Sequence, residues 1–232
     1  MNKYIFFSLT IILFFKSCSY PEIVRDDLIY ENDFENNNLQ HIDGGGLLTY
    51  NNTTVIGNFN NDGYTLHLDD VGNHDYIYVS FDLYIHGSWD GNFNGFSNDD
   101  RPDKWIIEYK PDMDLFKTLD SDRFETTFSN SPCYSNYCLR QSYPNSYPKE
   151  NNPKTGSFSS DLMAVCSDNF FGGPTTLYKI EKVFRSNGDA IVLRFYDELY
   201  QPNAIDKDGN PQEKCDESWS MDNLKVRVIQ YQ

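Results

Sequence analysis

Basic residues are scarce in this chain of 232 residues, which has 19 Lys and Arg against 35 Asp and Glu. The formal net charge of −16 argues against a nucleic-acid partner, because binding to a phosphate backbone depends on clustered Lys and Arg. Dense carboxylates do suit hard divalent cations, which take oxygen ligands. Most of these acids have a simpler role, which is to keep a folded domain soluble.

Recognisable catalytic motifs are also lacking. The sequence has no G-x-S-x-G nucleophile elbow, no H-E-x-x-H zinc motif and no E-x-D-x-x-E array of paired carboxylates on a strand. The four histidines are scattered, at His41, His67, His74 and His86, and a lone histidine in or beside a strand is by default structural. We therefore expect a protein that is not an enzyme, and we predict no catalytic residue.

Long hydrophobic runs are confined to the start of the chain, where residues 4–15 read YIFFSLTIILFF. Such a run is too short to span a bilayer as a stable helix, but it fits the apolar core of a secretory signal. Lys16, Ser17 and Cys18 follow. A small residue directly before a cysteine resembles the lipobox of bacterial lipoproteins, from which Lys16 departs.

The lipoprotein resemblance implies that residues 1–17 are removed and that Cys18 carries a lipid. The protein would then be exported and anchored to the bacterial membrane, at the outer membrane or cell surface. A simple cleaved signal peptide and a single short membrane anchor are the alternatives. The leader carries Lys3 and Lys16 and no acid, so its removal takes the formal charge from −16 to about −18.

Cysteine is sparse, and its count favours an oxidising compartment. Without Cys18 four cysteines remain, Cys133, Cys138, Cys166 and Cys215. An even number in an exported chain predicts two disulfides. Of the three possible pairings we favour Cys133–Cys138, which closes a small loop, together with Cys166–Cys215. A zinc site is the alternative, but the spacings do not resemble C-x2-C pairs.

No amphipathic helix longer than two or three turns is evident, and the pattern is that of alternating strands and polar turns. In residues 77–85 (IYVSFDLYI) every second side chain is apolar, which predicts a strand with one buried face. Residues 190–200 and 224–229 read in the same way. Weaker strands are predicted at residues 53–59, 64–68, 104–109, 124–128 and 177–184.

Short strands without intervening helices predict an all-β fold, namely an antiparallel β-sandwich with a jelly-roll-like topology and long irregular loops. We expect a tether at residues 18–27 and a single domain at 28–232. Two insertions interrupt the strands, at residues 87–103 and 129–160. A loop as long as the second is either functional or poorly ordered.

Three segments go beyond generic β sequence: 30–35 (YENDFE), 87–92 (GSWDGN) and 216–226 (DESWSMDNLKV). Together they resemble the MAM-like and carbohydrate-binding-like jelly-roll modules of secreted proteins, in a concanavalin or galactose-binding type of sandwich. In such modules the early DFE strand and the closing W-x-x-D-N strand lie side by side. We expect Trp219 to be part of the core whether or not this resemblance holds.

The same resemblance implies a structural calcium ion held by acids from the two ends of the domain. Glu35 and Asp222 are the first choice of ligands. Asp33, Asp216, Glu217 and Asn223 could supply further oxygens, since calcium takes six to eight. The acidic loop from Asp90 towards Asp103 is a second candidate cation site, although it does not match an EF-hand.

The predicted ligand is a glycan or polysaccharide, bound by a non-catalytic module. An exposed Trp89 could stack on a sugar ring, with Asp90 and Asn92 as polar contacts and with the loop 129–160 completing the surface. The alternative role for Trp89 is packing at the base of its loop. The alternative functions are an adhesion or assembly subunit that binds a surface protein and, less expected, a glycoside hydrolase.

Overall fold

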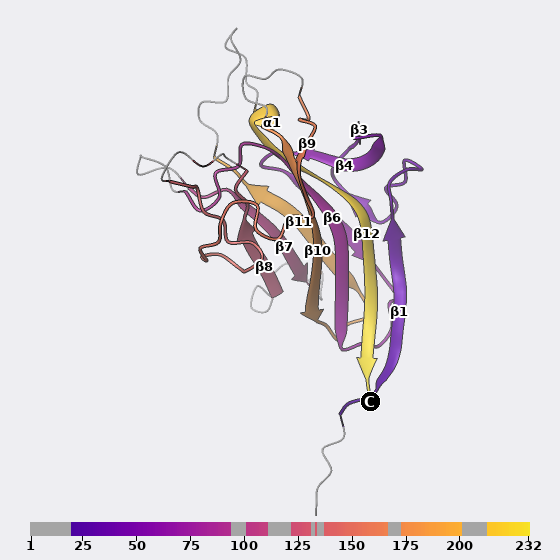
Figure 1. Cartoon of the computed structure of the whole chain (residues 1–232). Coiled ribbons are helices and arrows are strands. Elements are labelled where there is room, and N and C mark those ends of the chain that lie inside the picture. The colour runs from indigo at the N-terminus through magenta and orange to yellow at the C-terminus, as the bar shows by residue number, and fades with distance from the viewer. Residues whose placement is uncertain are drawn as a thin grey trace, which may run out of the picture.

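The computed structural model describes residues 20–93, 101–110, 122–130, 133, 137–166, 173–200 and 213–232. Cys18 and the rest of the leader lie outside these residues. Two antiparallel sheets make up the domain, so the all-β sandwich prediction is confirmed (Figure 1). The jelly-roll connectivity stays a prediction. Among the residues described, no helix is both long and apolar enough to cross a membrane.

The larger sheet has seven strands in the order β3-β4-β12-β6-β10-β9, and β1 pairs with β12 beside that path. β12 is long enough to pair with β4 through its first half and with β1 through its second half. The strands are β1 (Ile23–Asn32), β3 (Leu47–Tyr50), β4 (Thr53–Phe59), β6 (Tyr76–Gly87), β9 (Ser159–Leu162), β10 (Thr175–Arg185) and β12 (Glu217–Tyr231).

The smaller sheet has five strands in the order β2-β5-β11-β7-β8. They are β2 (Ile42–Asp43), β5 (Gly63–Leu68), β7 (Lys104–Lys110), β8 (Asp122–Thr127) and β11 (Ile191–Glu198). A four-residue helix, α1 (Glu213–Asp216), directly precedes β12. Each of the eight predicted strands overlaps one of these strands.

The tether prediction was too long. β1 begins at Ile23, and residues 23–32 pair with β12 up to Tyr231. The backbone of Gln232 also donates a hydrogen bond to the Glu22 carbonyl, at 2.9 Å. Both ends of the described chain therefore lie together at one end of the sandwich, and α1 lies at the opposite end (Figure 1).

The core forms where the inner faces of the two sheets meet. The alternation predicted for β6 is confirmed, since Ile77, Val79, Phe81, Leu83 and Ile85 are all buried. Trp219 is also fully buried, with its ring centroid 4.5 Å from Phe59 and 5.9 Å from Trp105. Such aromatic pairs contribute about 0.5–1.5 kcal/mol each beyond the burial of apolar area.

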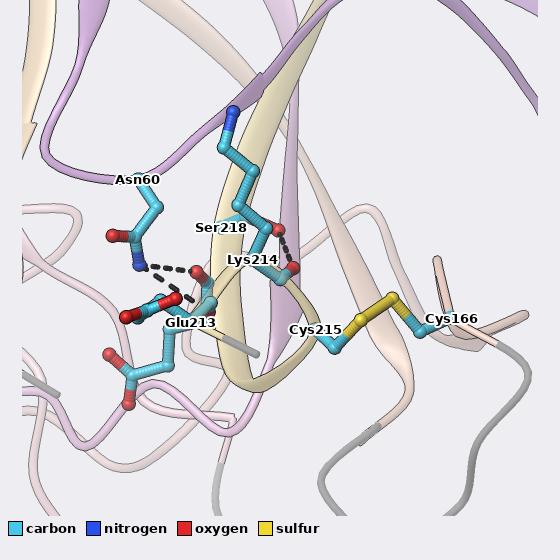
Figure 2. Close-up of a disulfide and its surroundings, with 7 residues drawn as sticks. Asn60, Cys166, Glu213, Lys214, Cys215 and Ser218 are labelled. Atoms are coloured by element: carbon cyan, nitrogen blue, oxygen red, sulfur yellow. Dashed lines mark hydrogen bonds between the residues drawn. A yellow bond between two sulfur atoms is a disulfide. The ribbon is translucent and has the colours of Figure 1, made fainter. Parts of the chain in front are cut away.

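The two disulfides pair as predicted, Cys133 with Cys138 and Cys166 with Cys215. Figure 2 shows that Cys166–Cys215 ties the segment after β9 to α1. On the other side of α1, the Asn60 side chain donates hydrogen bonds to the carbonyls of Glu213 (3.4 Å) and Glu217 (2.8 Å). The short helix at the start of β12 is therefore fixed by a covalent bond and by β4–β5 loop contacts.

Candidate functional site

Trp89 is not a sugar-stacking platform. Its side chain is fully buried, its indole nitrogen donates a hydrogen bond to the Ser218 carbonyl at 3.0 Å, and its ring meets Phe128 edge-on. Trp105 and Trp219 are fully buried too. Trp89 thus has the alternative role, packing at the base of its loop, because a tryptophan next to a β-strand end is readily drawn into the core.

Asn92 and Asp90 also act within the fold. The Asn92 carboxamide oxygen accepts hydrogen bonds from the Thr127 and Ser142 hydroxyls, and its nitrogen donates to the Lys149 carbonyl. The Asp90 backbone N–H donates to the Asp103 carboxylate at 2.7 Å. The Asn92 contacts join the loop 87–93 to the predicted contact loop, so its side chain serves the fold and is not the ligand contact that we predicted. The Asp90 contact is made by its backbone, and the predicted role of its side chain stays a prediction.

The described part of the loop 129–160 is held by side-chain to backbone hydrogen bonds around the buried Gln141. Its carboxamide oxygen accepts from the backbone N–H groups of Ser129 and Lys154, and its nitrogen donates to the carbonyls of Tyr143 and Thr155. Buried side-chain amides are in most cases hydrogen-bonded, and both polar atoms of Gln141 are bonded in a way that organises the loop. Nothing in the sequence marked Gln141 for that role.

The structure separates the predicted calcium ligands into two groups. Glu35 and Asp222 do meet, because the Thr53 hydroxyl contacts a carboxylate oxygen of each. Glu217 lies about 17 Å from Asp222 along β12, at roughly 3.4 Å per residue, and Asp216 precedes it in α1, so neither can share an ion with Asp222. The prediction of one site made from all six residues was therefore wrong.

Asp216 and Glu217 instead lie near Asp90 and Asp103. Asp216 accepts a hydrogen bond from the Ser88 hydroxyl at 2.8 Å, and the Glu217 and Asp103 side chains are hydrogen-bonded in the interior. Burial raises the pKa values of Asp103 and Asp216, and the nearby Asp90 carboxylate acts in the same direction. Asp103 thus favours the protonated, hydrogen-bonding form that a buried carboxyl adopts.

In the other group of predicted calcium ligands, which contains Glu35 and Asp222, Asp82 lies directly opposite Asp222 in the sheet. Burial, together with the charges of Asp82 and Glu35, raises the pKa of Asp222 to about 6. Asn223 and Lys179 both contact the Asp82 carboxylate. In the part of the chain that the structure describes, no group of three or more His, Cys, Asp or Glu side chains has a geometry that could hold a metal ion.

Asp33 and Asn223 line a polar hollow beside this cluster, at the junction of the turn after β1 and the bulge in β12. The other lining residues are Glu31, Asn32, Asn36 and Asn38. Several of these groups already have partners within the fold: Glu31 pairs with Lys225 at 2.6 Å, and the Asn32 amide donates to the Asn38 carbonyl at 2.9 Å. The hollow has carboxylates and amides, but its lining includes no aromatic ring.

A second hollow, on the outer face of the five-stranded sheet, does include an aromatic ring. It is lined by Asp43, Asn61, Asp62, Gly63, Tyr64, Thr65, Arg194, Tyr196 and Asp197. Tyr196 is partly exposed, and the guanidinium groups of Arg194 and Arg123 lie 4.3 Å and 5.8 Å from its ring centre. Gly63 is its cross-strand partner in β5, so no side chain covers the ring from that position.

The buried Asp197 carboxylate forms the base of this hollow. It accepts hydrogen bonds from the backbone N–H groups of Asn61 (2.6 Å) and Asp62 (3.2 Å) and from the Trp219 indole (2.8 Å). Burial raises the pKa of Asp197 to about 6, although these three donors favour its charged form. Asp197 therefore fixes the turn that presents the Asn61 and Asp62 side chains, and it ties that turn to the core.

Two serine–histidine hydrogen bonds are present in the structure, and both are buried. His86 Nε2 lies 2.9 Å from the Ser220 hydroxyl, and His74 Nε2 lies 2.6 Å from the Ser186 hydroxyl. The second nitrogen of each ring contacts a hydroxyl or a backbone carbonyl. With at most 4% of any of these four residues exposed, a substrate could not reach the serine oxygens, and we assign the pairs a structural role.

The Tyr196 hollow was missed because its parts are far apart in the sequence. The turn at Asn61-Asp62-Gly63 and the strand at residues 190–200 were both predicted, but only the pairing of β5 with β11 brings them together. The polar face of β11, with Arg194, Tyr196 and Glu198 at alternate positions, was the available signal. No family model matches the sequence, and no curated protein matches it either.

Proposed function

We propose that this domain is an exported, non-catalytic glycan-binding module and that the Tyr196 hollow is its binding site. The observation that carries the proposal is a partly exposed tyrosine ring with carboxylate, amide and guanidinium groups around it. A sugar ring has an apolar C–H face and a rim of hydroxyls. It therefore matches a site that combines one aromatic surface with a few fixed donors and acceptors.

The charged groups of the hollow are available to a ligand. The Asp43 side chain is 83% exposed, and its contact with His67 is 3.2 Å at the margin of the hollow. Asp62 and Arg194 are exposed as well. The hollow has a volume of about 270 Å³, near the lower limit of small-molecule sites, which suits one sugar unit of a longer chain.

The position of the hollow supports the proposed export and lipid anchoring. Tyr196 is near the end of β11, and the adjoining Asn60 contacts α1, at the end of the sandwich remote from residue 20. A chain attached through a lipid on Cys18 would keep this site away from the membrane. The two disulfides suit the oxidising compartment that export implies.

Replacing Tyr196 with Ala is expected to weaken glycan binding at least tenfold, because it removes the only aromatic surface that the described site exposes. Binding would be measured by isothermal titration calorimetry with polysaccharides selected in a screen, using residues 20–232, which contain both sheets. Tryptophan fluorescence would be a poor reporter, since all three tryptophans are buried.

Phe158→Ala is the matched control for this test. Phe158 is an exposed ring beneath a lysine ammonium, like Tyr196 beneath Arg194, but it lies by β9 of the other sheet. The control should bind as the parent does. If the Tyr196 variant bound glycan as tightly as the parent, the binding site would lie elsewhere on the domain. A folded domain that binds no glycan would favour the protein-binding alternative.

The structural calcium stays a prediction, with Glu35 and Asp222 as the two predicted ligands that lie on either side of the Thr53 hydroxyl. If it is right, 1 mM calcium should raise the melting temperature of the domain by about 5 °C over that in chelator, as a ligand at about 100 times its Kd would do. Asp222→Asn should abolish this response. The Asp216→Asn variant, which is changed at the remote end of β12, should still show the rise in melting temperature. If calcium does not change the melting temperature of the parent, the site is refuted.

A further inference from the structure

Part of the outer face of the seven-stranded sheet is uncovered. Towards α1 this face is covered, because Tyr50, Val55, Tyr84 and Leu177 form a second small core with Leu162 and Val165 packed on it. Towards the termini nothing among the described residues covers the sheet. There Leu28 of β1 is 50% exposed and Val183 of β10 is 57% exposed.

The strand registers arrange the side chains of this open face into rows across β1, β12, β6 and β10. Nearest the termini, the row reads Asp26, Ile229, Tyr76, Arg185. The next row reads Leu28, Arg227, Tyr78, Val183, and the third reads Glu31, Lys225, Ser80, Glu181. Successive rows are two residues apart along β6, β10 and β12, which is about 7 Å.

The open face differs in charge from the molecule as a whole. Its three rows carry three acids (Asp26, Glu31, Glu181) and three bases (Arg185, Arg227, Lys225), in a chain with nearly twice as many acids as bases. Two of the acids are already paired on the face, Asp26 with Arg227 and Glu31 with Lys225. Apolar and aromatic side chains lie between these pairs. Such a face does not repel a copy of itself.

We propose that this face binds the same face of a second copy of the chain, about a two-fold axis that runs parallel to the strands between β12 and β6. This rotation lays β1 of one copy over β10 of the other and keeps each row opposite itself. A closed dimer of this kind uses one self-complementary patch twice.

The rows match under this rotation. In the first row Asp26 faces Arg185 of the second copy, and Ile229 faces Tyr76. In the second row Leu28 faces Val183, and Arg227 faces Tyr78, whose ring already lies 5.8 Å from Arg227 of its own chain. In the third row Glu31 faces Glu181, but Lys225, which is 2.6 Å from Glu31, lies beside them and offsets the like charges.

The size of the face indicates a weak dimer. Four strands and three rows span roughly 20 Å by 20 Å with their side chains, about 400 Å² per copy, which is half of a standard interface. We expect a Kd on the order of 100 μM. Because the termini of both copies lie at the same end, two chains tethered to one surface could pair, and tethering raises their effective concentration into the millimolar range.

The test is a charge swap between two variants of the chain from residue 20 onward. Asp26→Lys and Arg185→Asp should each weaken dimerisation at least tenfold, because each homodimer then places like charges opposite one another twice. In the mixed dimer both contacts again join opposite charges. An equimolar mixture should therefore associate within about threefold of the parent, as measured by sedimentation equilibrium up to 1 mM.

Leu28→Glu and Val183→Lys form a second pair that leaves the Asp26–Arg227 contact intact. Each homodimer places a charge against an apolar side chain twice, and the mixed dimer has one contact between opposite charges and one unchanged apolar contact. Each variant should melt within a few degrees of the parent. A parent that stays monomeric at 1 mM would overturn the proposal. So would variants that dimerise as the parent does, which would place the contact elsewhere, or a mixture that fails to recover, which would exclude this two-fold axis.

Discussion

Lowering the pH from 7 to 4 should reduce the stability of the domain relative to a His86→Gln variant by about 3 kcal/mol. His86 is fully buried between the hydroxyls of Thr175 and Ser220, and this burial lowers its pKa from 6.5 to about 3. The folded state therefore favours the neutral ring. Its contribution is complete above pH 6.5 and is lost as the pH falls towards 3, at about 1.4 kcal/mol per pH unit.

The comparison with a variant is needed because buried acids titrate in the opposite sense. Burial raises the pKa of Asp197 and of Asp222 to about 6, so the folded state holds their protons and gains stability as the pH falls through 6 towards 3.8. Both proteins share these groups, and the difference between their unfolding free energies isolates the histidine. Urea titrations at several pH values would measure it.

Thr175→Val is the control for His86. It removes one hydrogen-bond partner of the ring and leaves the burial that causes the pKa shift. Its stability should differ from that of the parent by a constant amount across this pH range. A stability difference for His86→Gln that does not change with pH would show that the ring is not kept neutral by its surroundings.

Removing the Cys166–Cys215 disulfide, by changing both residues to Ser, should lower the unfolding free energy by about 4 kcal/mol. The bond joins residues 49 positions apart, so its loss frees a large loop in the unfolded chain. Because the bond also fixes α1 ahead of β12, the variant should become more sensitive to proteolysis at that end of the sandwich.

The Cys133–Cys138 pair supplies a matched comparison. Its cysteines are only five positions apart, and the same entropy relation gives a loss of about 2 kcal/mol for the corresponding double Ser variant. Urea unfolding of both variants would measure the two costs. If the short bond cost as much as the long one, then loop entropy would not explain the stabilisation.

Much of the fold could be predicted because buried strands carry their own signal. β6 alternates apolar and polar side chains, as a strand with one buried face must. β1 was missed because Arg25, Asp26 and Asp27 interrupt its pattern. As an edge strand it buries little of its length, and charges on such edges also discourage aggregation. Counting the cysteines left three disulfide pairings, and the favoured one is observed.

The candidate site was predicted poorly, for two physical reasons. Trp89 is flanked by Ser88 and Asp90 in the sequence, but residues far along the chain surround it, with Phe128 against its ring and the Ser218 carbonyl at its indole nitrogen. The closing motif places Asp216 near Asp222 in sequence, but an extended strand separates them in space. Tyr196 and Asp62, by contrast, are distant in sequence and are joined only by strand pairing.

The pairing of β1 with β12 also has a mechanical consequence. A pull that enters at residue 20 and is resisted by a ligand at the α1 end acts along the axis of β1. The bonds between antiparallel strands are perpendicular to that axis, so all eight paired positions from Ile23 to Asn32 are loaded in shear at once. Had β1 run in the opposite direction, the same force would have peeled it away one residue at a time.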